Sequence, residues 1–124
     1  MSLDVVSDTL NMIMNAKRAR KTIVETKGYS NLLLSVLAIA KLKGYIKEYK
    51  VDSKVLKIEI AKINGCRGIK PRYSVSASEI DKYISRYLPA KNIGIIIVST
   101  PKGLMTHQTA IEKNLGGSLI AYMF

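Results

Sequence analysis

Apolar residues recur at helical spacing at the start of the chain. Val6, Leu10 and Ile13 fall on one face of a helix that we predict from about residue 4 to residue 20. A Ser and an Asp within the first four residues are candidate caps for its start. Polar side chains occupy the opposite face, so the first element is expected to be an amphipathic helix.

Residues 31–43 form the second predicted helix and carry apolar side chains around most of its circumference. Ser30 is placed to cap this helix, and Gly44 is placed to end it. A helix that is apolar on all sides belongs between other elements. We therefore expect it to be buried in the core and to carry no chemistry.

Alternating apolar and polar positions predict strands around that helix. Residues 22–27 form a short strand, and residues 45–51 and 54–61 form a hairpin that turns at Asp52-Ser53. The resulting order is α-β-α-β-β, which is typical of one small lobe over residues 1–63.

The turn residues Asn64-Gly65 and Arg67-Gly68 mark the start of a second lobe over residues 64–124. Its predicted elements are an edge strand near residues 70–75, a helix over 79–88 capped by Ser78 and stopped by Pro89, a buried strand over 94–100, a short helix from Thr106 to residue 114 or 115, and a last strand over 118–124. Short helices mixed with an antiparallel-rich sheet make the whole chain an α+β protein of two small lobes.

The chain is strongly basic. Its 124 residues include 20 Lys and Arg against 9 Asp and Glu, which gives a formal net charge of +11 at pH 7. This excess favours a polyanionic partner, above all nucleic acid, because Lys and Arg release counterions when they neutralise phosphates. A membrane surface is the weaker alternative, and no run of about 18 apolar residues could span a bilayer.

A single cysteine and a single histidine restrict the chemistry. Cys66 cannot form an internal disulfide, and Cys66 with His107 makes a poor metal site. We expect no metal, no cofactor and no catalytic residue. The cysteine usage fits a reducing, cytoplasmic compartment.

The candidate site follows the apolar strand near the end of the chain. It supplies hydroxyls, one positive charge and one glycine, and it contains no carboxylate: Ser99, Thr100, Lys102, Gly103 and Thr106. Donors without acids suit phosphates and sugar edges, so we predict an RNA-binding loop over residues 99–106. Two alternatives stay open: an ordinary turn between a strand and a helix, and an enzyme acting on a phosphorylated or nucleotide substrate.

That enzyme would use Ser99, Lys102 and His107. A catalytic His needs an orienting carboxylate and a nucleophile, and the sequence offers no obvious set. At the start of a helix, His107 is expected to be a surface hydrogen-bonding group.

Three other groups of residues suit an RNA backbone. Gly116-Gly117 either ends a helix and opens a strand or lets RNA pass close by. Arg18 belongs to a basic cluster that either complements the helix dipole or, with Asn15, clamps a backbone. The span between Ile60 and Ile111 has only two acids, so a broad positive face is expected around its basic residues, which include Arg67, Lys70 and Arg72.

Several segments resemble the small-subunit ribosomal protein number eight family, in its archaeal and eukaryotic branch. The most specific is Ser99-Thr100-Pro101-Lys102-Gly103-Leu104-Met105-Thr106-His107, which is similar to that family's Ser-Thr-x-x-Gly-[Val/Ile/Leu]-Met-x-[Asp/His] loop. Asn64-Gly65-Cys66 with Ile69-Lys70-Pro71-Arg72-Tyr73, and Leu115-Gly116-Gly117 before the last strand, also match it. The resemblance covers essentially the whole chain.

The resemblance implies a structural, non-enzymatic protein of the small ribosomal subunit. Such a protein binds the central domain of small-subunit ribosomal RNA (rRNA), helps to assemble and stabilise the platform, and lies beside other ribosomal proteins without a small-molecule substrate. The family's main contacts then fall on the candidate loop and near Gly116 and Gly117, with weaker ones near Asn15 and Ser30. Pro101 departs from the small hydroxyl residue common there and removes a backbone donor.

The chemistry of the residues and the family resemblance together indicate one set of candidate RNA-binding residues: Ser99, Thr100, Lys102, Gly103, Thr106, His107, Gly116, Gly117, Asn15, Arg18, Ser30, Arg67, Lys70 and Arg72.

Overall fold

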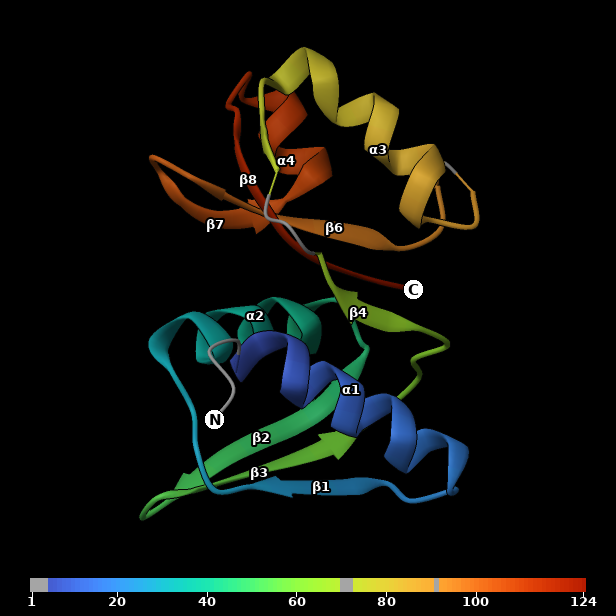
Figure 1. Ribbon diagram of the computed structural model, residues 1–124, viewed down its shortest axis with the longest axis vertical. Helices are drawn as coiled ribbons and strands as arrows, with labels where there is room; N and C mark the ends of the chain where they lie inside the picture. The colour runs from blue at the N-terminus through green and yellow to red at the C-terminus, as the bar shows by residue number, and fades with distance from the viewer. Residues whose placement is uncertain (1–4, 70–72, 91) are drawn as a thin grey trace. The chain divides into compact units, whose positions relative to one another are not determined.

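The computed structural model describes residues 5–69, 73–90 and 92–124. The chain divides into two compact units, Met1–Cys66 and Arg67–Phe124 (Figure 1). The first unit has the predicted α-β-α-β-β order, and its elements are α1 (Val5–Arg18), β1 (Ile23–Thr26), α2 (Asn31–Leu42), β2 (Ile46–Asp52) and β3 (Val55–Ile60). The predicted α+β class is confirmed.

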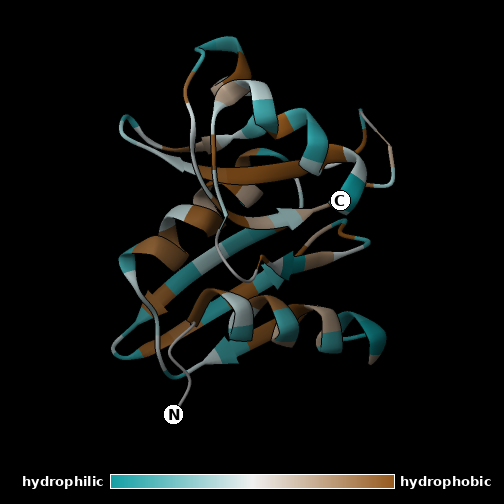
Figure 2. Ribbon diagram, turned by 45° about the horizontal axis from the view of Figure 1, so that its top comes forward, coloured by the Kyte–Doolittle hydropathy of each residue, from teal (hydrophilic) through white to brown (hydrophobic). Residues whose placement is uncertain are grey.

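The first unit packs two helices on one antiparallel sheet of strand order β1-β3-β2. Figure 1 shows α1 and α2 on the same face of that sheet. Val6, Leu10 and Ile13 of α1 are buried, as their helical spacing predicts, and polar residues line its outer face. Figure 2 shows the resulting apolar and polar stripes.

The ends of α2 agree with the sequence, but its burial does not. The backbone N–H of Leu33 donates to Ser30 Oγ at 3.1 Å, and Gly44 follows the helix with a φ of +85°. Leu33 and Leu37 are buried, whereas Leu42 is 81% exposed. The expectation of a helix buried on all sides is therefore wrong, because one sheet face and one neighbouring helix cover only part of its circumference.

The first hairpin turns one residue later than predicted. β2 continues through Asp52, and the turn consists of Ser53 and Lys54. Ser53 has a φ of 57°, a left-handed conformation that the tight connection requires.

The second unit is built on a five-stranded sheet of order β4-β8-β6-β7, with β5 also paired to β8. Figure 1 shows α3 and α4 on one face of this sheet. In chain order, the elements of this sheet and its helices are β4 (Cys66–Gly68), β5 (Ser74–Val75), the 3₁₀ turn η1 (Ala77–Glu79), α3 (Ile80–Tyr87), β6 (Ile95–Thr100), β7 (Gly103–Thr106), α4 (His107–Glu112) and β8 (Gly117–Met123).

The core of the second unit lies between this sheet and its helices. Val98 of β6, Leu119 of β8 and Val75 of β5 contribute to one buried cluster with Ile80 and Ile84 from the α3 side. The apolar run of β6 is buried along Ile95–Val98, as its composition predicts, and Figure 2 shows this strand in brown.

Ser78 does not cap the third helix as predicted: Ser76 caps the 3₁₀ turn η1, and Glu79 stands at the N-cap position of α3. The backbone N–H of Ser76 donates to Glu79 Oε1 at 3.1 Å, and a capping box forms around a 3₁₀ turn that precedes α3. These hydrogen bonds lower the pKa of the Glu79 carboxyl. Sequence spacing alone could not show which of the two nearby serines acts as the cap, because both precede Glu79.

Candidate nucleic-acid interface

The predicted loop over residues 99–106 is a tight β-hairpin. β6 and β7 pair in antiparallel register from Ile97 with Thr106 to Thr100 with Gly103, which leaves Pro101 and Lys102 as the turn. Figure 1 shows this hairpin reaching beyond the helices of its unit. Most of the segment expected as a loop between a strand and a helix is therefore paired strand, and the hairpin presents its tip on two paired strands.

Thr100 holds the tip in shape. Its hydroxyl donates to the carbonyl of Gly103 at 2.8 Å and accepts the backbone N–H of Lys102 at 3.2 Å. Its side chain is only 8% exposed. The hydroxyl that the sequence offered as an RNA donor is therefore engaged within the turn, where it positions the exposed Lys102 side chain.

Glycines serve two different purposes at this end of the unit. Gly103 has a φ of +114°, a backbone conformation that residues with a side chain rarely adopt, so the glycine permits the turn. Gly117 lies against the backbone of β6: a Cβ there would overlap the carbonyl oxygen of Ser99 and lie 3.1 Å from Thr100 Cα. The predicted residues Ser99, Thr100 and Gly117 are thus in direct contact.

Gly116 is equally close to another strand. A Cβ there would overlap the carbonyl oxygen of Val75 and lie 2.9 Å from Ser76 Cα. This close approach supports the structural alternative for the glycine pair, in which the two glycines allow the last strand to begin close to its neighbours. Both glycines remain half-buried rather than fully covered.

Strand pairing creates a row of hydroxyls that the sequence did not suggest. Ser99 of β6 pairs with Ser118 of β8, and Ser118 pairs with Ser74 of β5. Their strand neighbours Val98, Leu119 and Val75 belong to the core cluster, so the three serines lie on the opposite face. Within the described chain, none of the three side chains makes a hydrogen bond.

Such a row could not be found from the sequence, since it depends on the register of three strands. Cross-strand partners share a face and lie about 5 Å apart. Three hydroxyls at that spacing, each able to donate and to accept, suit a run of phosphate and sugar oxygens.

Thr106 and His107 lie at the opposite end of β7 and do not share the tip. Thr106 caps α4 by accepting the backbone N–H of Thr109 at 3.4 Å, as predicted. His107 is 2% exposed, and its Nδ1 accepts the backbone N–H of Ile96 at 3.0 Å. The expectation of a surface histidine is wrong, and we do not retain His107 in the interface.

Burial also determines the protonation of His107. Desolvation lowers the pKa of its imidazole, an effect that the negative charge of Asp81 partly offsets. A neutral imidazole keeps Nδ1 free to accept the hydrogen bond from Ile96. The residue therefore links the start of α4 to the central strand of the core.

The candidate residues of the first unit form no single site. Asn15 and Arg18 are exposed on α1, three residues apart on one face. Ser30 caps α2, where its hydroxyl is already used. β1 runs between the end of α1 and the start of α2, so these candidates lie at opposite ends of that strand.

Of the remaining basic candidates, the structure describes only Arg67. Arg67 is exposed on β4, which borders β8. Lys70 and Arg72 lie outside the described residues, as does half of the predicted edge strand over 70–75, of which the structure shows β5.

In the described part of the chain, no three His, Cys, Asp or Glu side chains gather in a way that could hold a metal ion. In the same residues, no helix combines the length and the apolar character needed to cross a membrane.

Comparison with known proteins agrees with the resemblance read from the sequence. The model of the Ribosomal protein S8 family matches residues 4–124. The chain is also similar to the small ribosomal subunit protein uS8 of the archaeon Nanoarchaeum equitans (strain Kin4-M), with 43% identity over 129 aligned positions that cover all of both chains. The chain therefore belongs to the Ribosomal protein S8 family.

Proposed function

We propose that this protein binds small-subunit rRNA directly through the tip of the β6–β7 hairpin and the neighbouring end of β8. Its role in the small ribosomal subunit, in the cytoplasm, is to hold the central domain of the RNA and to help assemble and stabilise the platform. The family consists of structural ribosomal proteins, so the enzyme alternative through Ser99–His107 is set aside.

One observation carries the proposal: within the described residues, donors that make no hydrogen bond gather on strands that carry no acid. The row Ser99, Ser118 and Ser74 lies beside the turn that exposes Lys102. Asp and Glu are absent from the hairpin and from β8. A phosphate backbone therefore meets hydroxyls and a cation there without a like charge to repel it.

The rigid base of the hairpin favours binding with little loss of entropy. Thr100 fixes the turn, and Gly117 fits β8 closely against β6. Since these groups are held before RNA arrives, little conformational freedom remains to be lost on binding. Asn15, Arg18 and Arg67 are proposed to add weaker, mainly electrostatic contacts.

The salt dependence of rRNA binding tests the contribution of the tip. Lys102→Ala should flatten the slope of log affinity against log salt by up to about one unit, because one phosphate contact is lost. Lys82→Ala, at an exposed position on α3, serves as the control and should leave the slope unchanged. An equal response of both variants would remove Lys102 from the interface.

The assembly role needs a separate measurement. Chemical probing of small-subunit rRNA with and without the purified chain should show protection confined to the central domain. Protection elsewhere, or none at a protein concentration that saturates binding, would contradict the proposed place of the protein in the platform.

A further inference from the structure

The sheet of the first unit has an outer face that neither α1 nor α2 covers (Figure 1). Four of the nine acidic residues of the chain lie on it: Glu25, Glu48, Asp52 and Glu59. Lysines of the same strands partly balance them. In a chain of net charge +11, this face is the exception, because it offers no excess of positive charge to a phosphate backbone.

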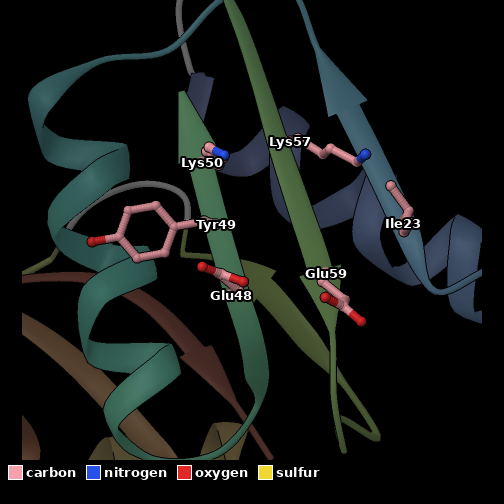
Figure 3. Close-up of a pocket in the computed structure, with 6 residues that line it drawn as sticks. All are labelled: Ile23, Glu48, Tyr49, Lys50, Lys57 and Glu59. Atoms are coloured by element: carbon pink, nitrogen blue, oxygen red, sulfur yellow. The ribbon is translucent and has the colours of Figure 1, made fainter. Parts of the chain in front are cut away.

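Two cross-strand pairs on this face join charges of like sign, and Glu25 of β1 adds an opposite charge beside one of them, directly opposite Lys57. Glu48 of β2 lies directly opposite Glu59 of β3, and Lys50 lies directly opposite Lys57. Figure 3 shows the two carboxylates level with each other and the two lysines level with each other, one step along the strands. Like charges in directly opposed positions destabilise a sheet. Exchanging one Glu and one Lys would have made both pairs favourable.

The chain itself answers one charge of each pair, because Lys57 also lies directly opposite Glu25 of β1 and Glu59 has a lysine partner. A β-bulge between Ile46 and Glu48 brings Lys47 within 3.6 Å of Glu59. Glu48, Lys50 and Lys57 form no ion pair with any described residue. Ile23 lies at the end of the acidic row and is 45% exposed, and a hollow of about 200 Å³ opens among these side chains.

We propose that this face docks a neighbouring protein of the small subunit. The partner presents a Lys or Arg to the Glu48–Glu59 row and an Asp or Glu to the Lys50–Lys57 row, with an apolar contact on Ile23. The two rows are two residues, about 7 Å, apart along the strands. A partner strand presents such a charge pair at positions i and i+2, and a partner helix presents it at i and i+4.

RNA fits this face less well than a protein does. A phosphate placed on Lys50 and Lys57 would lie two residues along the strands from two carboxylates, which repel it and have no hydrogen-bond donor to offer it. The inference rests on the place of the chain in the small subunit, but it does not require the hairpin tip to bind rRNA.

A charge exchange within the face tests the inference. The double variant Glu48→Lys with Lys50→Glu keeps the net charge and turns both opposed pairs into attractive ones. We expect the isolated variant to melt about 2–5 °C higher than the wild type, since two repulsive pairs are removed. Its affinity for rRNA should be unchanged.

The same variant should dock poorly in the assembled subunit. A benzophenone side chain at position 23 of the full chain provides the probe, and crosslinked peptides from purified small subunits provide the readout. The wild-type face should crosslink to a protein peptide that carries a basic and an acidic residue two or four positions apart. The double variant should lower that yield at least fivefold.

A matched control separates docking from a general effect of charge. Glu112→Lys with Lys113→Glu exchanges two exposed charges at the end of α4 and should leave the crosslink yield unchanged. Crosslinking to rRNA, to a peptide without the charge pair, or to nothing would overturn the proposal. Failure of rRNA binding in the wild-type chain would contradict the proposed function but not the docking face.

Discussion

The hydroxyl of Thr100 donates to the carbonyl of Gly103 at 2.8 Å and closes the turn that presents Lys102. The same oxygen accepts the backbone N–H of Lys102, so one side chain fixes both sides of the tip. The shape of the proposed rRNA-binding surface thus depends on a hydroxyl that RNA does not need to touch.

Thr100→Val should therefore weaken rRNA binding by loosening the turn. The near-isosteric methyl cannot replace either hydrogen bond, and a loss of about 1–2 kcal/mol corresponds to an affinity about 5- to 30-fold lower. Filter binding measures the affinity. Thr100→Ser keeps the hydroxyl and should bind as the wild type does, and a valine variant of unchanged affinity would separate the turn from the interface.

Gly117→Ala should destabilise the second unit. The added methyl overlaps the carbonyl oxygen of Ser99, and its relief requires β8 to move away from β6 at a cost of about 1–3 kcal/mol. Urea unfolding measures the difference. Gly28→Ala is the control, because no atom lies within 4 Å of a Cβ at that position. Equal stability of the two variants would contradict the close fit of the strands.

His107 should make the protein sensitive to acid. Burial lowers the pKa of its imidazole in the folded state, so the unfolded chain binds the proton more readily. The stability that the neutral imidazole contributes is fully present above its ordinary pKa of 6.5, and it is lost as the pH falls below that value. Melting temperatures between about pH 7 and pH 5 should fall less for His107→Gln than for the wild type. Parallel curves would argue against the role assigned to burial.

The thiol of Cys66 should be inert until the first unit unfolds. Burial raises its pKa to about 12, and its Sγ donates to the carbonyl of Leu10 at 3.4 Å. At a given neutral pH, a rise from 9 to 12 reduces the thiolate about a thousandfold. Reaction with a disulfide reagent should be slow in buffer and rapid in urea. Rapid labelling of the native chain would show that the thiol is accessible.

Local signals predicted most of the first unit. The spacing of Val6, Leu10 and Ile13 gave the buried face of α1, and Ser30 and Gly44 gave the ends of α2, because caps and periodicity depend on neighbouring residues. The exposure of Leu42 could not be predicted in the same way. It depends on which faces of α2 meet the sheet and α1.

The sequence indicated which residue types gather in the candidate site, but it could not indicate how they are arranged. Composition marks the segment from Ser99 to Thr106 as rich in donors, yet its strand pairing, the internal use of the Thr100 hydroxyl and the burial of His107 are tertiary features. The pairing of Ser99 with Ser118 and Ser74 has no trace in local sequence, because the three residues come from distant segments.

Crosslinking of the purified chain to small-subunit rRNA, followed by mapping of the attached peptides, tests the account most directly. Ultraviolet crosslinks are expected to concentrate on the peptides that contain Ser99 to Gly103 and Gly116 to Ser118, and to map to the central domain of the RNA. Crosslinks confined to other surfaces, with both of these peptides free of nucleotide at saturating RNA, would contradict this account.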